Sequence, residues 1–261
     1  MQESAVLTRA AAPDRVPTLV IPCFNEADRL QGPAFEHFLS KNPSWRLLFV
    51  NDGSTDDTTT VLRALEARLP RQISVLLLEK NGGKAEAVRR GILAAIESGT
   101  DYVGFWDADL ATPLAEAPAM LSALETSEPT HAVIASRVKL LGRNIQRRAA
   151  RHYLGRVFAT MAAVAIQLPV YDSQCGAKIF RVNDATRRTF GEPFFSRWIF
   201  DVEMLARLTG PGHVDANARV VSVIEFPVDT WTDVPGSKVK VSDFVKSIAE
   251  LGYIWWHYRQ R

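Results

Sequence analysis

Cysteine and long apolar runs are both scarce in this chain. Only two of its 261 residues are cysteines, Cys23 and Cys175, and both stand in apolar surroundings without the spacing of metal ligands. This excludes a disulfide framework and a cysteine zinc site, and it indicates a reducing compartment. No run of about 18 or more apolar residues is present, so no membrane-spanning helix is expected. We therefore expect a cytoplasmic protein.

Several other signatures are absent as well. Residues 1–16 lack the apolar core of a signal peptide, and we expect a flexible N-terminus there. No G-x-G-x-x-G follows the first expected strand, which weakens a nicotinamide-cofactor interpretation, and the P-loop spacing is missing too. The net charge is only +2, so the composition does not indicate a nucleic-acid binder.

Acidic residues are missing from one internal stretch. Between Thr130 and Tyr171 there is no Asp or Glu. The cations of that stretch are Arg137, Lys139, Arg143, Arg147, Arg148, Arg151 and Arg156. We expect a helix over about 143–168, in which arginines precede an apolar run. That pattern favours a helix lying at an anionic bilayer surface. A surface helix with one buried end is the alternative.

The C-terminal segment also combines cations with apolar side chains, which here are aromatic. Residues 253–259, Tyr-Ile-Trp-Trp-His-Tyr-Arg, place aromatic side chains beside cations. Aromatic residues next to cations are typical of a membrane interface. A helix that packs its tryptophans onto the domain is an equally good interpretation.

Strand and helix patterns alternate along the chain. Strands are expected at 18–22, 46–51, 73–78, 102–106, 131–136, 177–181 and 220–228. Helices are expected at 26–39, 57–69 (with Ser54 as a capping residue near its start), 84–98, about 114–124, 143–168, 199–208 and 242–258. Repeated β-α-β units predict a parallel sheet with helices on both faces. No linker or internal repeat is visible, so we expect one domain with a C-terminal extension.

Two carboxylates follow the fourth expected strand, in the triplet Asp107-Ala108-Asp109. In open α/β sheets, ligands bind in the crevice beyond the carboxyl ends of the strands. Two hard oxygen donors at that place suit Mg²⁺ or Mn²⁺ together with substrate phosphates. Such a triplet is common, however, and a solvated strand-to-helix turn is the alternative.

Polar motifs also follow the first three strands. Glu26 follows the first and Asp52 the second, where either could accept hydrogen bonds from a nucleobase or ribose. Taken alone, the segment around Asp52 is a turn and helix cap. After the third strand, Asn81-Gly82-Gly83-Lys84 opens a helix with flexible backbone and a cation, which suits a phosphate.

Together, these motifs carry a family resemblance. The order Pro-x-x-Asn-Glu, Asn-Asp-Gly-Ser-x-Asp, Asn-x-Gly-Lys and Asp-x-Asp resembles the family-2 inverting glycosyltransferases. Residues 135–137, 172–180 and 197–203 look like the polyprenyl-phosphate sugar synthases, with dolichyl-phosphate β-glucosyltransferases nearest and the mannosyltransferases next. The resemblance implies the GT-A fold, a Rossmann-like mixed α/β sheet with helices on both faces. It covers about residues 20–240, so we expect a catalytic domain over 17–241 and an amphipathic helix over 242–261.

The resemblance also implies a reaction. It is that of an inverting hexosyltransferase which moves a sugar, by preference glucose from UDP-glucose, onto a polyprenyl or dolichyl phosphate. A GDP-mannose donor or a hydroxyl acceptor are the alternatives. The implied partners are these two substrates and, peripherally, the cytoplasmic face of a membrane, with no nucleic acid.

Residue roles follow from the same resemblance. The resemblance implies that the residues in contact with the nucleotide sugar are Pro22, Phe24, Asn25, Glu26, Asp52, Gly82, Gly83, Lys84, Asp107, Ala108, Asp109, Gln174, Trp198 and Lys238. Asp107 and Asp109 would hold Mg²⁺ or Mn²⁺, and Ala111 replaces a Gln that can be a further ligand in mannosyltransferases. The acceptor phosphate would meet Arg137, Arg147, Arg148 and Arg151. A hydroxyl acceptor would need a base, for which Asp201 and Glu203 are the candidates.

Overall fold

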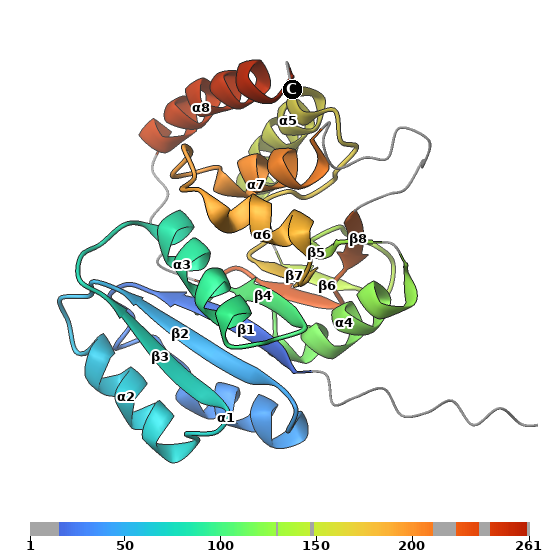
Figure 1. Ribbon diagram of the computed structural model, residues 1–261. Coiled ribbons are helices and arrows are strands. Elements are labelled where there is room, and N and C mark those ends of the chain that lie inside the picture. The colour runs from blue at the N-terminus through green and yellow to red at the C-terminus, as the bar shows by residue number, and fades with distance from the viewer. Residues whose placement is uncertain (1–15, 129, 147–148, 211–222, 235–240, 260–261) are drawn as a thin grey trace, which may run out of the picture.

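A mixed seven-stranded sheet forms the centre of the protein (Figure 1). The computed structural model describes residues 16–128, 130–146, 149–210, 223–234 and 241–259, with backbone only at 149–154, 241–245 and 259. The strands, in the order in which they lie side by side, are β3 (Ile73–Leu78), β2 (Arg46–Asp52), β1 (Pro17–Cys23), β4 (Tyr102–Trp106), β7 (Ala177–Arg181), β5 (Ala132–Ser136) and β8 (Val223–Pro227). Two short strands, β6 (Asn144–Gln146) and β9 (Thr230–Thr232), pair separately.

Strand direction brings distant segments to one edge. β1 runs parallel to β2 and β4, and β5 runs parallel to β8. β7 runs antiparallel to both β4 and β5. The start of β7 therefore lies at the edge where β1, β2, β4 and β5 end, which we call the carboxyl edge. The mixed sheet implied by the family resemblance is confirmed: the strands of the repeated β-α-β units, β1 to β5, all run in one direction, and β7 runs against them.

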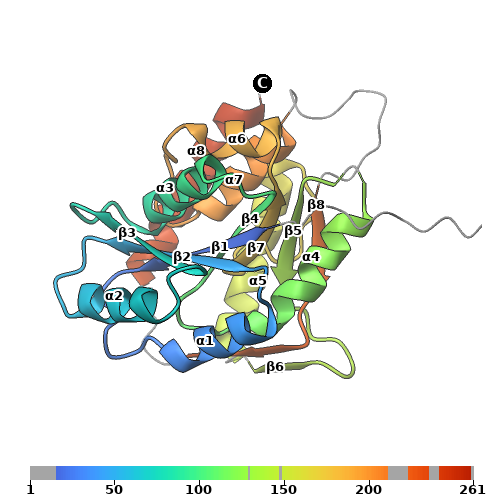
Figure 2. The ribbon, with the colours of Figure 1, turned by 60° about the horizontal axis from the view of Figure 1, so that its bottom comes forward.

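Helices cover both faces of the sheet (Figures 1 and 2). One face packs against α1 (Gly32–Lys41), α2 (Thr58–Arg68) and α4 (Ala117–Thr126). The other packs against α3 (Lys84–Glu97), α6 (Asp184–Gly191) and α7 (Phe200–Thr209). Two further helices, α5 (Ala149–Ile166) and α8 (Val241–Arg259), share a third apolar cluster with α7 and form an outer layer.

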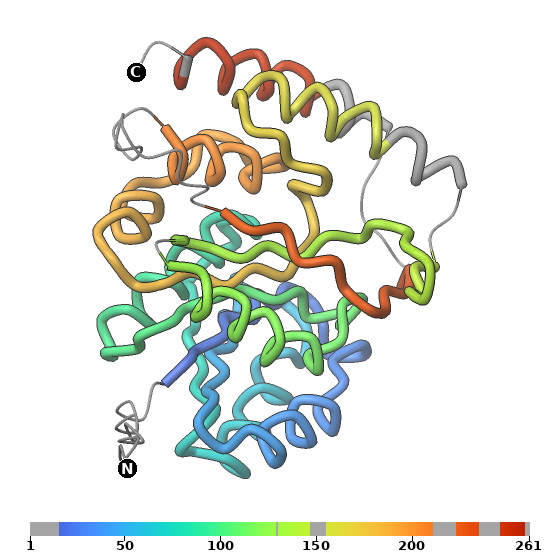
Figure 3. The backbone as a smooth tube through the Cα atoms, turned by 90° about the vertical axis from the view of Figure 1, so that its right-hand side faces the viewer, coloured from blue at the N-terminus to red at the C-terminus, as the bar shows by residue number. Residues whose placement is uncertain are grey.

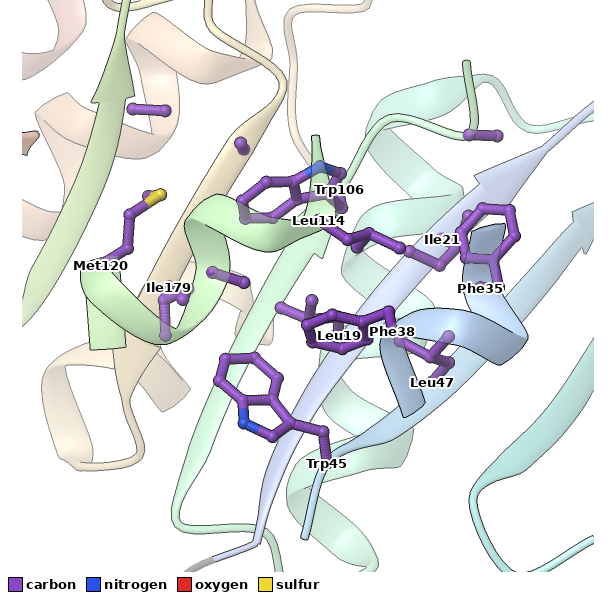
Figure 4. Close-up of a cluster of buried hydrophobic side chains, with 14 of the residues drawn as sticks. Leu19, Ile21, Phe35, Phe38, Trp45, Leu47, Trp106, Leu114, Met120 and Ile179 are labelled. Atoms are coloured by element: carbon purple, nitrogen blue, oxygen red, sulfur yellow. The ribbon is translucent and has the colours of Figure 1, made fainter. Parts of the chain in front are cut away.

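The central strands are apolar on both sides because both of their faces are covered. In β1, Leu19 and Ile21 belong to the cluster under α1, whereas Val20 belongs to the cluster under α3. Figure 4 shows the first cluster, with Phe35 and Phe38 of α1 against the sheet. Burial of side chains of this size contributes about 1.5–3 kcal/mol each, so these two cores hold the carboxyl edge in place.

Two expectations near the N-terminus are wrong. The helix predicted from Glu26 begins only at Gly32, because the carbonyl oxygen of Glu26 accepts hydrogen bonds from the amides of Arg29 and Leu30 in a turn. Ser54 does not cap α2. Its Oγ instead accepts a hydrogen bond from the amide of Asn25, at 3.0 Å.

The long helix expected over 143–168 is also corrected. Residues 144–146 form β6, whose first amide donates to the carbonyl oxygen of Asp229, and α5 begins at Ala149. The helix α6 was not predicted, although Asn183 caps it by accepting a hydrogen bond from the amide of Thr186. The C-terminal helix, α8, extends one residue beyond each end of the expected range 242–258, and the last two residues of the expected range 242–261 lie outside the described residues. Within the described residues, no helix is both long and apolar enough to cross a bilayer.

Candidate active site

Asp107 and Asp109 lie at the carboxyl edge, directly after β4. The amide of Asp107 donates to the carbonyl oxygen of Gly176 at 2.9 Å. A Cβ on Gly176 would overlap the carboxylate of Asp107 in its present position, so a larger residue there would displace this carboxylate. Asp109 accepts a hydrogen bond from the amide of Ala111 at 3.1 Å. Burial, and after it the negative charge of Asp107, raises the pKa of Asp109.

Lys84 faces the same carboxylates from the first turn of α3. Its Nζ is 2.5 Å from Oδ1 of Asp107, and its side chain is partly open to solvent. Burial alone would lower the pKa of Lys84, but the charges of Asp107, Asp201 and Asp109 outweigh it and raise the pKa. The lysine therefore stays charged and is placed to neutralise negative charge at the edge.

Asp52 organises the loop that precedes Lys84. Its Oδ1 and Oδ2 accept hydrogen bonds from the amides of Gly82 and Gly83, each at 2.8 Å. The side chain is almost fully buried, and burial raises its pKa against the opposing effect of the two amides. Gly53 adopts a φ of 64°, and a Cβ there would lie 2.6 Å from the backbone at residues 80 and 81. The Asp52 turn and the glycine loop are thus fixed against each other.

The segment after β1 is tied to the one after β2. Asn25 has a φ of 52°, and its Oδ1 accepts a hydrogen bond from the amide of Thr55 at 2.9 Å. The carboxylate of Glu26 accepts from Nε and Nη2 of Arg29, at 2.9 and 2.5 Å. Pro22 occupies the end of β1, and Phe24 follows it half-buried. The structure therefore brings Pro22, Phe24, Asn25 and Glu26 to the carboxyl edge beside Asp52.

A second cationic position lies at the end of β5. Arg137 donates from Nε and Nη2 to Oδ2 and Oδ1 of Asp172, at 2.6 and 2.7 Å, and from its backbone amide to Oδ2. Burial alone would lower the pKa of Arg137, but the charge and hydrogen bonds of Asp172 raise it. Its guanidinium carbon is 5.3 Å from the Trp231 ring centroid. Two donor hydrogens on Nη1 are not used by Asp172 and can meet an anion.

Asp172 is itself held by Glu225 of β8. The two carboxylate oxygens of Glu225 accept hydrogen bonds from the amides of Tyr171 and Asp172, at 2.7 and 2.8 Å. Arg156 adds a hydrogen bond from Nη1 to the carbonyl oxygen of Tyr171 at 2.7 Å. The turn before β7 is thereby fixed from two sides.

Asp201 and Glu203, the two candidate bases, are both buried and both paired. Asp201 Oδ1 lies 2.5 Å from Nζ of Lys178, a fully buried lysine in β7. Glu203 accepts hydrogen bonds from the amides of Phe195 and Ser196, from Nη2 of Arg207 and from the hydroxyl of Tyr258. Neither is a free carboxylate at the carboxyl edge.

Comparison with known proteins places this arrangement in a family. The family model described as "Glycosyl transferase family 2" matches residues 18–187. The chain belongs to glycosyltransferase family 2. A dolichyl-phosphate beta-glucosyltransferase of Trichomonas vaginalis is 32% identical to this glycosyltransferase, covering 93% of this chain and 71% of the relative. The dolichyl-phosphate beta-glucosyltransferase of Saccharomyces cerevisiae is 29% identical, over 90% and 72%.

Solved structures show the same fold. The glucosyl-3-phosphoglycerate synthase of Mycobacterium tuberculosis in complex with UDP superposes on this glycosyltransferase with a TM-score of 0.64. It is 18% identical, and the match covers 92% of this chain and 80% of that one. A complex of the same synthase with Mn²⁺, UDP-glucose and phosphoglyceric acid gives a TM-score of 0.63 at 19% identity, over 92% and 80%. The GT-A fold implied by the sequence motifs is confirmed.

The residues of this glycosyltransferase fit a divalent metal. Asp107 and Asp109 crowd two hard oxygen ligands together, which is a donor set for Mg²⁺ or Mn²⁺. Burial, and after it the charge of Asp107, raises the pKa of Asp109, and a bound cation would oppose both effects. Within the described residues, no group of three or more His, Cys, Asp or Glu side chains could hold a metal. A divalent metal here therefore needs substrate and water oxygens to complete its ligands.

The structure describes the positions of only some of the other expected site residues. Trp198 is exposed on the segment before α7, and Gln174 is half-buried in the turn before β7. Arg147, Arg148 and Lys238 lie outside the described residues, as does the side chain of Arg151. All assigned roles, including those of Asp107 and Lys84, stay predictions.

The sequence interpretation missed four residues that support this edge. Asp172 and Gly176 belong to a quoted motif, but their contacts with Arg137 and Asp107 were not foreseen. Lys178 is a charged residue in a buried strand, a signal that it must be paired. Glu225 gives no such signal, because β8 is half-exposed and a glutamate there is unremarkable in sequence.

Proposed function

We propose that this glycosyltransferase transfers glucose from UDP-glucose to the phosphate of a polyprenyl lipid, with inversion at the anomeric carbon. The observation that carries the proposal is the arrangement at the end of β5, where a half-buried, charged Arg137 is bound by Asp172, while the candidate base Asp201 is paired with Lys178. The two similar relatives, both named dolichyl-phosphate beta-glucosyltransferases, support the same donor and acceptor.

On the donor side, the nucleoside would lie against Pro22, Glu26 and the Asp52 turn. The amides of the glycine loop and Lys84 would then face the diphosphate, since Lys84 begins a helix whose N-terminus favours an anion. Asp107 and Asp109 would hold the metal, which lowers the charge that develops on the leaving diphosphate. We propose Mn²⁺ or Mg²⁺; a neighbouring solved structure contains Mn²⁺ with UDP-glucose.

On the acceptor side, Arg137 would position the lipid phosphate. The second pKa of a phosphomonoester is about 6, so the attacking oxygen is already largely ionised at neutral pH. Such a nucleophile needs an arginine for orientation and charge, and no general base. The pairing of Asp201 with Lys178 agrees with a reaction that needs no general base, because a carboxylate engaged in a buried ion pair is poorly placed to remove a proton.

A donor panel tests the proposal. The purified protein is incubated with a polyprenyl phosphate, Mn²⁺ or Mg²⁺, and UDP-glucose or GDP-mannose, and the glycolipid is identified by mass. We expect a hexosyl phosphate lipid from UDP-glucose. A product from GDP-mannose but not from UDP-glucose would show that GDP-mannose is the donor. The absence of a lipid product with any donor would overturn the proposal.

Two variants separate the acceptor classes. We expect Asp201→Asn to melt at a lower temperature, because it leaves Lys178 buried without its counter-ion, but to keep transfer per folded molecule. Arg137→Lys keeps the charge but loses the two-point hydrogen bond, and it should raise the KM for the lipid while UDP-glucose hydrolysis persists. Loss of all transfer in Asp201→Asn, with donor binding intact, would favour a hydroxyl acceptor instead.

We also propose that the protein works at the cytoplasmic face of a membrane as a peripheral protein. A polyprenyl phosphate stays in the bilayer, so the carboxyl edge must approach the lipid headgroups. The basic, acid-free stretch between Thr130 and Tyr171 supplies the charge for such an approach.

A further inference from the structure

The segment between β5 and β6 forms a tight turn with an apolar tip. The amide of Arg143 donates to the carbonyl oxygen of Leu140 at 3.1 Å, and Gly142 has a φ of 85°. These features are those of a β-turn that needs glycine at its third position. Leu141 occupies the second position and is fully exposed, and Leu140 is 47% exposed.

Both ends of this turn are held, so the exposure of the leucines is a property of ordered backbone. At one end, Arg137 is bound by Asp172. At the other, Arg143 pairs with Asp229, and β6 pairs with β9. Figure 3 shows the turn, in yellow-green after β5, at the right-hand edge of the molecule. Two adjacent leucines exposed on an ordered turn form a contiguous apolar patch, the kind of feature that marks an interaction site.

The charge around the tip indicates what that partner is. Lys139 is exposed beside Leu140, and no acidic residue occurs in the sequence between Thr130 and Tyr171. Leucines beside an exposed lysine match the boundary between anionic headgroups and acyl chains, where apolar side chains insert and cations meet lipid phosphates. A protein partner would have to supply both an apolar pocket and acidic residues.

We propose that the turn of residues 139–143 inserts into an anionic bilayer, with Leu140 and Leu141 reaching the acyl boundary. Arg137 stands at the root of this turn, only three residues before Leu140. Insertion therefore brings the guanidinium to the depth of a lipid phosphate, so that the acceptor is presented without leaving the membrane. This use of the surface rests on the proposed function, whereas the insertion itself does not.

The chain offers a matched control on the opposite side of the sheet. Leu77 lies in β3, at the far edge from β5 and β8, and it is an exposed leucine like Leu141, at 42% exposure. Both native cysteines are buried, so a cysteine introduced at either leucine can be labelled selectively.

Vesicles without any acceptor lipid test the insertion. Binding of wild type, Leu141→Asn and Leu77→Asn to phosphatidylcholine vesicles containing phosphatidylserine is measured by flotation. We expect Leu141→Asn to bind roughly tenfold or more weakly, the size of one buried leucine, and Leu77→Asn to match wild type. Equal binding by all three would overturn the inference.

A direct readout of depth comes from labelled cysteine variants. Leu141→Cys carrying an environment-sensitive fluorophore should shift to shorter wavelength on these vesicles, while labelled Leu77→Cys should not. Equal or absent shifts would contradict insertion. Failure of the proposed function looks different: both vesicle results would hold, yet no donor would yield a lipid product.

Discussion

At the scale of single residues, the candidate metal site depends on a missing side chain. Gly176 lies opposite Asp107, and its lack of a Cβ leaves room for the carboxylate. The same glycine accepts the hydrogen bond of the Asp107 amide through its carbonyl oxygen. If Asp107 ligates a metal, as proposed, Gly176 is a positioning residue, because it sets where the carboxylate of Asp107 can lie.

A Gly176→Ala variant tests this. The new Cβ would overlap the Asp107 carboxylate, so we expect a roughly 10- to 100-fold loss of Mn²⁺ affinity, the size typical of residues that position metal ligands. Calorimetric titration of Mn²⁺ measures it. Gly191→Ala is the control, since a Cβ there meets nothing within 4 Å and should leave the affinity unchanged. Equal losses in both variants would show a general effect on the fold.

At this scale, most of the residues of the site could be predicted from the sequence, but few of the contacts between them could. Carboxylates placed just after strands are local features, and Asp52, Asp107 and Asp109 were found that way. The partner of Arg137 lies 35 residues away and that of Lys178 lies 23 away. No local pattern reports such contacts, so the role of Asp201 as a counter-ion could not be foreseen.

At the scale of elements, α8 fixes the segment that leads into α7. The carboxylate of Glu250 accepts hydrogen bonds from Ser196 Oγ at 2.5 Å and from the amides of Arg197 and Trp198 at 3.5 and 3.4 Å. The rings of Phe195 and Tyr253 stack at 3.7 Å. Because α7 carries Asp201, the C-terminal helix reaches the site through this segment.

Limited proteolysis measures the strength of this contact. Arg197 is exposed, and we expect Glu250→Ala to speed tryptic cleavage after it by about tenfold, because two or three hydrogen bonds no longer oppose local opening. Mass spectrometry follows the fragment. Lys246→Gln, exposed on the same helix, should cleave like wild type. An unchanged rate in Glu250→Ala would show that α8 does not hold the segment.

At the scale of the whole molecule, α5 and α8 form an outer layer over α7. Helix α8 buries Leu251 and Ile254 against its neighbours but leaves Trp255 and Trp256 largely exposed. The helix therefore packs on the protein chiefly through Leu251 and Ile254 rather than through its tryptophans, and the membrane contact of the aromatic segment stays a prediction.

A change of salt and a tryptophan variant test whether the basic stretch and α8 contact lipid. Raising the ionic strength from 0.1 to 1 M shortens the Debye length from about 10 to 3 Å. We expect binding to anionic vesicles to fall several-fold with salt, and Trp256→Ser to weaken it further at low salt. Binding to neutral vesicles is the comparison. Salt-independent binding would mean that the basic stretch does not contact lipid.

The sequence by itself determined the family, the order of the motifs and the presence of acidic groups at strand ends, because each of these is a property of neighbouring residues. Only the tertiary structure decided how they combine. The reversal of β7 brings residues 172–176 to the carboxyl edge, and the packing of α8 connects the C-terminus to α7. Such outcomes depend on which distant segments bury one another, and burial is a property of the whole fold.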